Sequence, residues 1–398
     1  MSNNWNVVPF TEAVDICDTF RKPINSSERA SRIKGKEQSE LYPYYGATGQ
    51  VGFIDDYITD GEYVLLGEDG APFLDAFSNK AYIISGKTWV NNHAHVLRSK
   101  TNNKFLCYYL NSFNYKGYVS GTTRLKLTQA EMKRIPVPVP PLSEQERIVS
   151  RIEELFSQLD AGVETLKKTK AQLAVYRQAV LKEAFNSAEV DCKMLLIAEI
   201  LTKTRKGMST GPFGTMIKKS DHKATGVPML GIENIGRGQF VDGNKIYVTA
   251  EKAEELKAFS LRAGDIIISR SGTVGEICAV PERAEGSLLS TNLMRVSLDN
   301  TMIRSDYFIA LFQSKGIVLD QIKELCKGST RDFLNQTILK QIVFPVPSME
   351  KQEEIVSIIE ARMSVCDSIE QTVDIALQQA EVMRQSILKD AFEGRLLE

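Results

Sequence analysis

The closest approach to a metal-binding motif in this sequence is the pair His93 and His95, which are separated by one residue. Side chains two residues apart on a β-strand point to the same face, so a strand here would bring the two imidazoles together. A zinc site needs further ligands, and no cysteine, aspartate or third histidine lies close to the pair in the sequence. We therefore expect structural or hydrogen-bonding roles for both histidines and no metal site.

Other signatures of catalysis are equally weak. Residues 86–88 read Gly-Lys-Thr, as at the end of a phosphate-binding loop, but bulky β-prone residues at 82–84 stand where backbone amides would have to wrap a phosphate. The Asn-Pro-Pro-aromatic motif with which adenine methyltransferases hold a flipped base does not occur. We expect no catalytic residues and no cofactor bound by this chain itself.

Length and composition predict a folded protein of several domains. The 398 residues exceed what one hydrophobic core normally fills. The content of 43% hydrophobic and 25% charged residues is typical of folded globular domains. No apolar run is as long as a membrane span, the first residues do not resemble a secretion signal, and the six cysteines form no Cys-x-x-Cys pair. We therefore expect a cytoplasmic protein with reduced thiols.

The net charge of −1 hides an uneven distribution. Residues 1–140 hold 16 basic and 14 acidic side chains, and residues 187–347 hold 21 and 18. Residues 348–398 hold only 5 basic against 11 acidic side chains. The slightly basic parts are compatible with a polyanionic partner, whereas the acidic segment would repel phosphates and should face protein or solvent.

An internal repeat is the strongest signal in the sequence. At a fixed offset of 207 residues, Gly121-Thr122-Thr123-Arg124 aligns with Gly328-Ser329-Thr330-Arg331, and Pro138-Val139-Pro140 aligns with Pro345-Val346-Pro347. The match runs without a gap for some 65 residues, as far as Phe185 in the first copy. A register held over this length indicates two copies of one structural unit.

Upstream of this region the two copies match more loosely. Gly61–Leu66 and Gly264–Ser269 are apolar runs opened by a glycine, which predicts a buried strand in each copy. A second pair of strands and a pair of short helices are predicted at Asn92–Leu97 with Asn292–Ser297, and at 105–110 with 308–312. Similar elements with different sequences indicate a common frame that carries two different surfaces.

A long helix is predicted after each Pro-rich segment. The prolines between residues 136 and 141 hold the chain extended, so the first helix can begin only after them. Ser143 and Glu146 have the spacing of a capping box. In the second copy Glu350 takes the place of Ser143, and we expect Ser348 to cap that helix instead.

Apolar residues recur at spacings of three and four along both helices, as in a coiled-coil seam. An isolated helix would leave this stripe in water, so we expect the two helices to pair along it. The predicted pairing residues are Ile148, Ile152, Leu155, Leu159, Leu166, Leu173, Ile355, Ile359, Val373, Leu377 and Ile387. The alternative is that each helix packs on its own globular domain.

The predicted fold class is α+β, with two mixed α/β globular domains separated by two long helices. The helices are expected to pair as an antiparallel coiled coil, which would make the internal repeat pseudo-twofold and hold the globular domains a set distance apart. The expected boundaries are 1–141 for domain 1, 142–186 for the first long helix, 187–347 for domain 2 and 348–398 for the second long helix.

This duplicated pattern resembles the specificity subunit (S, HsdS) of type I restriction–modification systems. The resemblance covers essentially the whole chain and is carried by Pro138–Val149, Pro345–Val356 and the Gly-Thr-Thr-Arg and Gly-Ser-Thr-Arg loops before them. Lys351, at the position of Glu144, departs from the usual Glu-Gln pair, but Gln352 and the glutamate after it are retained.

The resemblance implies that both globular domains are target-recognition domains, each of which reads one half of an interrupted site in double-stranded DNA. It also implies that the paired helices set the spacer and bind two modification (methyltransferase) subunits, and that restriction/translocase subunits complete the complex. The chain itself would be non-catalytic. S-adenosylmethionine, ATP and Mg²⁺ would bind to the partner subunits, and no membrane would be involved.

Candidate DNA contacts follow from side-chain chemistry. Lys, Arg and small hydroxyls contact phosphates, and residues that recur in both copies cannot explain two different sequence preferences. We therefore assign Thr122, Thr123, Arg124, Ser329, Thr330 and Arg331 to the DNA backbone. Base-reading side chains should lie where the copies differ, in Gly-interrupted loops. The candidates are Tyr44, Tyr45, Thr48 and Gln50 in domain 1, and Lys218, Lys219, Arg270, Ser271 and Thr273 in domain 2.

The main alternative is a protein-interaction scaffold in which the coiled coil carries two binding domains that have no role with DNA. An enzyme ranks third, because no nucleophile, metal site or acid–base pair emerges from the sequence.

Overall fold

The computed structural model describes residues 5–186, 192–272, 274–314, 316–326 and 334–397. Contacts divide the chain into two units, residues 1–168 with 373–398 (unit 1) and residues 169–372 (unit 2). Each unit combines one globular domain with a part of each long helix, and each is described by itself. Among the described helices, none is both long and apolar enough to cross a bilayer.

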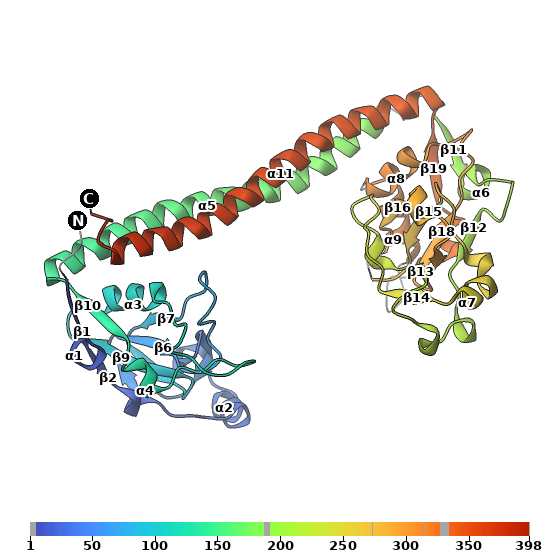
Figure 1. The fold of residues 1–398 in the computed structure, drawn as a ribbon. Coiled ribbons are helices and arrows are strands. Elements are labelled where there is room, and N and C mark those ends of the chain that lie inside the picture. The colour runs from blue at the N-terminus through green and yellow to red at the C-terminus, as the bar shows by residue number, and fades with distance from the viewer. Residues whose placement is uncertain (1–4, 187–191, 273, 315, 327–333, 398) are drawn as a thin grey trace. The chain divides into compact units, whose positions relative to one another are not determined.

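Domain 1 is built on two four-stranded sheets and a two-stranded ribbon (Figure 1). The first sheet is antiparallel in the order β2-β9-β6-β7, with β2 at Val14–Ile16, β6 at Tyr63–Gly67, β7 at Ala81–Ile84 and β9 at Ala94–Ser99. The second has the order β4-β3-β8-β5, with β3 at Tyr42–Gly46, β4 at Gly49–Ile54, β5 at Thr59–Asp60 and β8 at Lys87–Val90. The ribbon pairs β1 (Asn6–Pro9) with β10 (Pro136–Val139).

Helix α3 covers the first sheet of domain 1 and buries Phe105, Leu106 and Leu110. Its capping residue is Asn102, whose side chain accepts a hydrogen bond from the Phe105 amide at 3.0 Å. The helices of domain 1 are α1 (Phe10–Ala13), α2 (Ser26–Ile33), α3 (Asn103–Ser112) and α4 (Gln129–Met132). The predicted strands and the predicted short helix are therefore confirmed as β6, β9 and α3.

Domain 2 repeats this plan. An antiparallel sheet has the order β12-β18-β15-β16, with β12 at Met208–Thr210, β15 at Ile266–Ser269, β16 at Ile277–Ala279 and β18 at Leu293–Val296. A three-stranded sheet has the order β14-β13-β17, with β13 at Val227–Leu230, β14 at Ile246–Val248 and β17 at Leu288–Leu289. The ribbon pairs β11 (Lys193–Leu196) with β19 (Val343–Val346). The helices are α6 (Ile197–Ile200), α7 (Ala250–Glu255), α8 (Ser305–Gln313), α9 (Val318–Cys326) and α10 (Gln336–Leu339).

The predicted strands and helix of the second copy are confirmed as β15, β18 and α8. The core of domain 2 is apolar, with Ile266, Met294 and Phe308 fully buried. The two ribbons also match, because Val139 and Val346, which are equivalent in the repeat, each pair with the first residue of the partner strand.

The long helices are α5 (Leu142–Asn186) and α11 (Met349–Phe392), and they run side by side in opposite directions within each unit (Figure 1). In unit 1, Arg384 pairs with Asp160. In unit 2, Arg177 Nη2 lies 2.7 Å from Asp367 Oδ1. Both ion pairs join residues that are equivalent at the offset of 207, so the same contact is made twice. The predicted antiparallel pairing is confirmed.

The predicted apolar stripe is the buried side of the helices, but its ends also contact the globular domains. In unit 1, Ile148 and Ile152 pack with Leu388 of α11 and with Phe105 of α3. In unit 2, Ile355 and Ile359 join the core of domain 2 together with the last turns of α5. Among the remaining predicted residues, Leu173 and Val373 are buried, and burial is partial for Leu155, Leu159, Leu166, Leu377 and Ile387. Both of the predicted packing modes, helix on helix and helix on domain, therefore occur.

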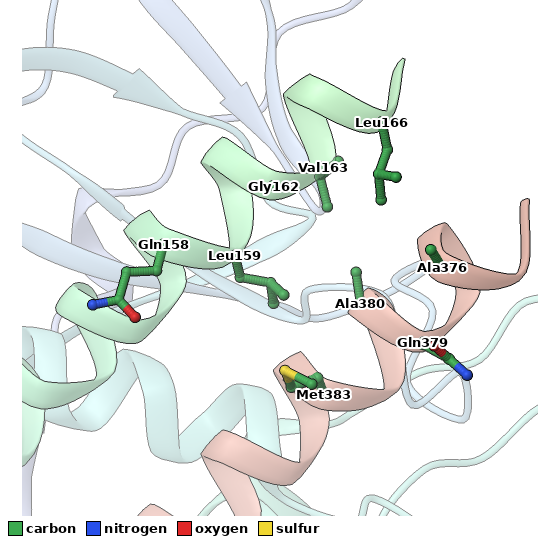
Figure 2. Close-up of a pocket in the computed structure, with 9 residues that line it drawn as sticks. All are labelled: Gln158, Leu159, Gly162, Val163, Leu166, Ala376, Gln379, Ala380 and Met383. Carbon is green, nitrogen blue, oxygen red and sulfur yellow. The ribbon is translucent and has the colours of Figure 1, made fainter. Parts of the chain in front are cut away.

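A shallow apolar hollow separates the helices in unit 1. Figure 2 shows Leu159, Val163 and Leu166 of α5 on one side of it, and Ala376, Ala380 and Met383 of α11 on the other. Gly162 borders the hollow on α5, and apart from its chain neighbours and the adjacent helix backbone no atom lies within 4 Å of the place where its Cβ would be. The helix pair is therefore less tightly packed here than at Ile148 and Ile152, which are 1% and 0% exposed.

The starts of the helices correct one prediction and confirm another. Ser348 accepts a hydrogen bond from the Lys351 amide at 3.3 Å, so it caps α11 as expected. The prediction of a capping box at Ser143 is wrong, because α5 begins one residue earlier, at Leu142, and the Gln145 amide bonds to the Pro141 carbonyl at 3.0 Å. Pro141, the last of the prolines, directly precedes α5, and its carbonyl accepts hydrogen bonds from the Glu144 and Gln145 amides.

A buried glutamine anchors each helix to its globular domain. Gln145 and Gln352, equivalent in the repeat, are both 0% exposed. Gln145 Nε2 donates to the Pro140 carbonyl at 2.9 Å, and its Oε1 accepts from the Thr101 hydroxyl at 2.9 Å. Gln352 makes the equivalent bond to the Pro347 carbonyl, also at 2.9 Å. The glutamine that recurs in both copies therefore has a structural role.

Candidate nucleic-acid interface

In domain 1, Glu68–Gly70 directly follow the buried strand β6 and are held between two other segments. The Glu68 amide donates to the His93 carbonyl at 2.8 Å, and the Glu68 carbonyl accepts from the Leu127 amide at 2.7 Å. The Gly70 amide donates to the Leu125 carbonyl at 2.9 Å. These bonds bring the residues before β9 and the Gly-Thr-Thr-Arg loop to one edge of the domain.

The Gly-Thr-Thr-Arg loop is a tight, closed turn. Ser120 and Lys126 exchange two backbone hydrogen bonds, at 3.0 and 2.8 Å. Gly121 has φ +98°, and a Cβ there would lie 2.4 Å from the Arg124 carbonyl oxygen, so only glycine fits. Thr122, Thr123 and Arg124 are exposed at the tip.

This exposure suits the predicted contact of Thr122, Thr123 and Arg124 with the DNA backbone, which stays a prediction. The equivalent residues Ser329, Thr330 and Arg331 lie outside the residues that the structure describes.

Three polar side chains converge at the edge of domain 1 that is formed by the backbone hydrogen bonds of Glu68 and Gly70. Asp69 Oδ1 lies 2.7 Å from His93 Nδ1 and accepts a hydrogen bond from Arg124 Nη2 at 2.8 Å. Asp69, His93 and Arg124 line an open hollow together with Thr48, Asn91 and neighbouring small residues. Asn91 supports this arrangement, because its side chain accepts a hydrogen bond from the His93 amide at 2.8 Å.

A second ionic group lies beside the first. Glu68 pairs with Arg21, and its Oε1 lies 3.3 Å from Lys126 Nζ. Arg21 also pairs with Asp18, whose Oδ2 lies 3.2 Å from Arg21 Nη2, so the three basic groups at this edge of domain 1 are balanced by three carboxylates. Arg124 and Lys126, with side chains 61% and 49% exposed, are the basic groups of this edge that a polyanionic ligand can reach.

Domain 2 has the same backbone frame with different side chains. The Arg270 amide donates to the Asn292 carbonyl at 2.9 Å, and the Arg270 carbonyl accepts from the Leu334 amide at 3.0 Å. Arg270 is therefore the structural equivalent of Glu68, and Leu334 lies at the offset of 207 from Leu127. The structure thus places an acidic and a basic residue at the same position of the two domains.

The Arg270 guanidinium is partly buried and bonds to the protein. Its Nε donates to the Leu334 carbonyl and its Nη1 to the Thr291 carbonyl, both at 3.2 Å. Burial lowers the pKa of Arg270 from its ordinary value. These bonds hold the side chain in one orientation beside Thr291, which is exposed and bonds to the Pro212 carbonyl at 2.6 Å.

The predicted loop containing Tyr44 and Tyr45 is wrong in its secondary structure. Both residues lie in strand β3, and Tyr44 is only 3% exposed because it packs with Ile54 and Trp89. Tyr45 is half-buried, with its ring centroid 5.9 Å from that of Tyr82. The strand buries the Tyr44 ring, which therefore offers no surface to a base in this structure.

The other predicted base readers of domain 1 are exposed. Thr48 lies in the turn between β3 and β4 and lines the hollow that Asp69 and Arg124 share. Gln50 lies in β4, and its side-chain amide donates to the Gly52 carbonyl at 3.1 Å. Their base-reading role stays a prediction.

In domain 2 the predicted base readers are not all brought together. Lys218 and Lys219 are exposed in the segment between β12 and β13. Ser271 follows Arg270 directly and is half-buried. Thr273 lies outside the described residues. The roles proposed for these residues also stay predictions.

The two histidines make hydrogen bonds to different carboxylates, as expected. His95 is 1% exposed, with Nδ1 at 2.8 Å from Asp18 Oδ2 and Nε2 at 3.1 Å from the Leu127 carbonyl. His93 faces the hollow instead. In the described part of the chain, no group of three or more His, Cys, Asp or Glu side chains is arranged to hold a metal.

The sequence prediction missed Asp69, which joins His93 to Arg124. The three residues are separated by 24 and 31 positions, so no short motif connects them. The available signal was the acidic pair that follows the buried strand and precedes Gly70.

Comparisons with known proteins agree with this architecture. The model of the type I restriction modification DNA specificity domain matches the chain twice, at residues 4–174 and 211–379. A putative type I restriction enzyme specificity subunit from Haemophilus influenzae is 28% identical over 380 residues, which cover 94% of this chain and 91% of the relative. The EcoBI specificity subunit from Escherichia coli is 26% identical over 391 residues, which cover 92% and 79%.

Solved structures show the same fold. A chain from a study of complex assembly and conformational transition in the type I R-M system has a TM-score of 0.72 at 16% identity, with 99% of this chain and 98% of that chain covered. The HsdS subunit from Thermoanaerobacter tengcongensis has a TM-score of 0.54 at 14% identity, with the same coverage. Because the two domain matches together span most of its length, this chain belongs to the type I restriction–modification DNA specificity family.

Proposed function

We propose that this chain is the non-catalytic specificity subunit of a type I restriction–modification complex, in which each globular domain reads one half of an interrupted DNA site. The supporting observation is the repeated backbone frame that carries Glu68 in domain 1 and Arg270 in domain 2. A shared frame positions both domains on DNA in the same way, and exposed side chains that differ around it select different bases.

The paired helices set the spacer between the half-sites and bind two modification subunits. S-adenosylmethionine, ATP and Mg²⁺ bind to partner subunits, restriction/translocase subunits complete the assembly, and the complex works in the cytoplasm.

Methylation mapping tests this function. The chain is co-expressed with its modification subunits, and the methylated positions in the cellular DNA are mapped by sequencing. We expect one motif made of two short half-sites at a fixed separation. A single continuous motif, or methylation that does not depend on this chain, contradicts the proposal.

Salt dependence separates this function from that of a protein-interaction scaffold. Binding to duplex DNA releases counterions, so the logarithm of the affinity should fall steeply and linearly with the logarithm of the salt concentration. A scaffold without a role with DNA gives no binding to the mapped duplex beyond that to unrelated sequences.

Exposed apolar residues on the helices support the docking of two identical partners. Val175 and Tyr176 in unit 2 are 72% and 50% exposed, and their equivalents Val382 and Met383 in unit 1 are 58% and 54% exposed. Large apolar side chains in water mark interaction sites. The same pair of positions is exposed in both copies, as expected for one docking site per modification subunit.

Single charges at these positions test the docking. Val175→Asp and Val382→Asp should each weaken the binding of one modification subunit, and the double variant should weaken both, as counted by native mass spectrometry. Val175→Leu and Val382→Leu retain an apolar surface and serve as controls. Two firmly bound subunits in the double Asp variant would show that docking uses another surface.

A further inference from the structure

We propose that Asp69, His93 and Arg124 form the base-reading cluster of domain 1. This inference rests on the proposed function and names the residues that carry it out in one half-site. It gives Arg124 a role at the bases, in place of the backbone contact that its recurrence in the sequence predicts.

The cluster has free hydrogen-bonding atoms that face one open hollow. Asp69 uses Oδ1 for both His93 and Arg124, and its Oδ2 makes no hydrogen bond with the described residues. Among the described residues, the His93 ring bonds only through Nδ1, and its Nε2 has no partner there. Within the described part of the chain, the Arg124 guanidinium bonds only through Nη2, and its side chain is 61% exposed. One acceptor, one imidazole nitrogen and several guanidinium donors are therefore presented together.

The carboxylate favours base edges over phosphates as the ligand. A phosphate oxygen next to Asp69 Oδ2 would be repelled, whereas an exocyclic amino group donates to a carboxylate. An acidic neighbour offsets the positive potential of an arginine and therefore weakens its attraction to a phosphate. The uncommitted Asp69 oxygen is thus the observation that distinguishes base reading from backbone positioning.

The cluster is also held in place before DNA binds. Asp69 fixes Arg124 through a 2.8 Å bond, and the Arg124 side chain passes over Gly70, where a Cβ would lie 3.2 Å from Arg124 Nε. Gly70 has φ +72°, a conformation that favours glycine. Holding a long side chain in advance lowers the entropy cost of binding and sharpens the discrimination between bases.

The chemistry of the cluster predicts the kind of bases. Arginine donates to O6 and N7 of guanine, and a carboxylate accepts from the amino group of cytosine. The half-site read by domain 1 should therefore contain a guanine and an amino-bearing base within reach of the same cluster. The residue of domain 2 at the position equivalent to Asp69 is Ser271, so the two domains present different side chains there and are expected to read different bases.

Methylation by the complete complex with its modification subunits measures this role. For Asp69→Asn and Arg124→Lys, the methylation rate is compared on duplexes that carry every single base-pair change in both half-sites. We expect discrimination at one or two base pairs of one half-site to fall roughly 5- to 150-fold, with the other half-site unchanged. His93→Gln should relax the same half-site less, because glutamine retains a hydrogen-bonding side chain.

A matched control separates recognition from loss of an ion pair. Asp390 and Arg395 form an exposed pair at the C-terminal end of α11, with Arg395 Nη2 at 2.6 Å from Asp390 Oδ1. Asp390→Asn makes the same chemical change as Asp69→Asn and should leave both half-sites unchanged. Thermal melting of all variants identifies any that do not fold, and Arg124→Lys, at an exposed site, keeps the test decisive if Asp69→Asn is unstable.

The outcomes distinguish this inference from the proposed function. If the wild-type complex shows no two-part motif, the proposed function fails. If the motif exists and Asp69→Asn and Arg124→Lys slow methylation equally on all duplexes, the cluster contacts phosphates or is structural, and the inference is overturned. Relaxation in both half-sites, or in neither, overturns it as well.

Discussion

The two globular domains use the same backbone hydrogen bonds around the residue that follows the central strand, but they place opposite charges there. In domain 1 this residue is Glu68, which pairs with Arg21 and Lys126. In domain 2 it is Arg270, which donates to the backbone carbonyls of Leu334 and Thr291. The backbone bonds leave the side chain unconstrained, so its charge can change without a change of fold.

The interiors of the two domains also differ, at one equivalent pair of residues on neighbouring strands. His95 on β9 is paired with Leu66 on β6, and the equivalent pair in domain 2 is Met294 with Ile268. At this position domain 1 thus holds a buried polar network and domain 2 an apolar pair, whereas a buried polar group of domain 2 lies at Asp265, which Arg205 and Ser297 contact. The frame tolerates both solutions because the polar groups of His95 are satisfied by Asp18 and the Leu127 carbonyl.

The largest expected effect is the loss of stability when the buried glutamine that anchors each long helix is replaced. Gln352 bonds to three backbone groups, the Arg304 amide and the Met302 and Pro347 carbonyls, each at 2.9 Å. Gln145 bonds to one carbonyl and one hydroxyl. Because each unsatisfied buried group costs roughly 1–3 kcal/mol, Gln352→Ala should destabilise by about 3–4 kcal/mol and Gln145→Ala by about 2 kcal/mol.

Urea unfolding of the full chain measures these costs. Circular dichroism follows both units, and tryptophan fluorescence follows unit 1, because Trp5 and Trp89 both lie there. Gln379→Ala, at an exposed glutamine of α11, is the control. Equal losses for Gln145→Ala and Gln352→Ala would show that the two anchors are equivalent despite their different partners.

Low pH should destabilise the buried hydrogen-bond network that Asp18 and His95 form in domain 1. Burial alone would raise the pKa of Asp18, but hydrogen bonds from His95 and the Val96 amide and the charge of Arg21 together lower it below its ordinary value. A lowered pKa in the folded state means that the stabilisation is present above about pH 4 and is lost as the pH falls through the folded-state pKa.

Asp18→Asn measures this contribution. At neutral pH the variant should be about 2–3 kcal/mol less stable, since it leaves buried partners of Asp18 uncompensated. The difference from the wild type should shrink as the pH falls from about 4 through the lowered folded-state pKa, below which the wild-type carboxyl is also neutral. Tryptophan fluorescence, recorded during urea unfolding at several pH values, reports the unfolding of unit 1, which holds both tryptophans. A difference that stays constant with pH would contradict the ionic role of Asp18.

Removal of the charge at the equivalent positions Glu68 and Arg270 sharpens the comparison between the two domain surfaces. Arg270→Ala should cost about 1–3 kcal/mol of discrimination at one base pair of one half-site if the arginine reads guanine. Glu68→Gln should change the motif little, because Glu68 is engaged by Arg21 and Lys126. Competition binding with single-substitution duplexes provides the measurement. Uniform loss across sequences for Arg270→Ala would identify a phosphate contact.

The long helices and the repeat could be predicted from the sequence because their signals are periodic and local. The offset of 207 residues aligns Gln145 with Gln352 and the two ion-paired arginines, Arg177 and Arg384, and the structure gives each pair the same role. The core strands β6 and β15 could also be predicted, since a short uninterrupted apolar run opened by a glycine is typical of a buried strand.

The ribbons and the surface cluster could not be predicted because they depend on distant contacts. Strand β1 pairs with β10 across more than a hundred residues, and β10 is so rich in proline that its sequence predicts only an extended chain. The glycines that follow Tyr44 favour a loop, yet one face of β3 is buried against Trp89. Asp69 could not be predicted because its partners are brought to it by backbone bonds that no local pattern reveals.

The smallest expected effect compares the helices themselves. Gly162 on α5 in unit 1 is equivalent to Ile369 on α11 in unit 2, and a Cβ at Gly162 would contact nothing within 4 Å. Alanine at this helical position should therefore stabilise the chain by about 0.5–1 kcal/mol through helix propensity alone, and Ile369→Gly should destabilise it by a similar amount. Thermal melting should show Gly162→Ala shifted upward by about 2–3 °C. A lower melting temperature would mean that the hollow beside Gly162 is filled by a contact that only glycine allows, and the two helix copies would then differ in packing as well as in sequence.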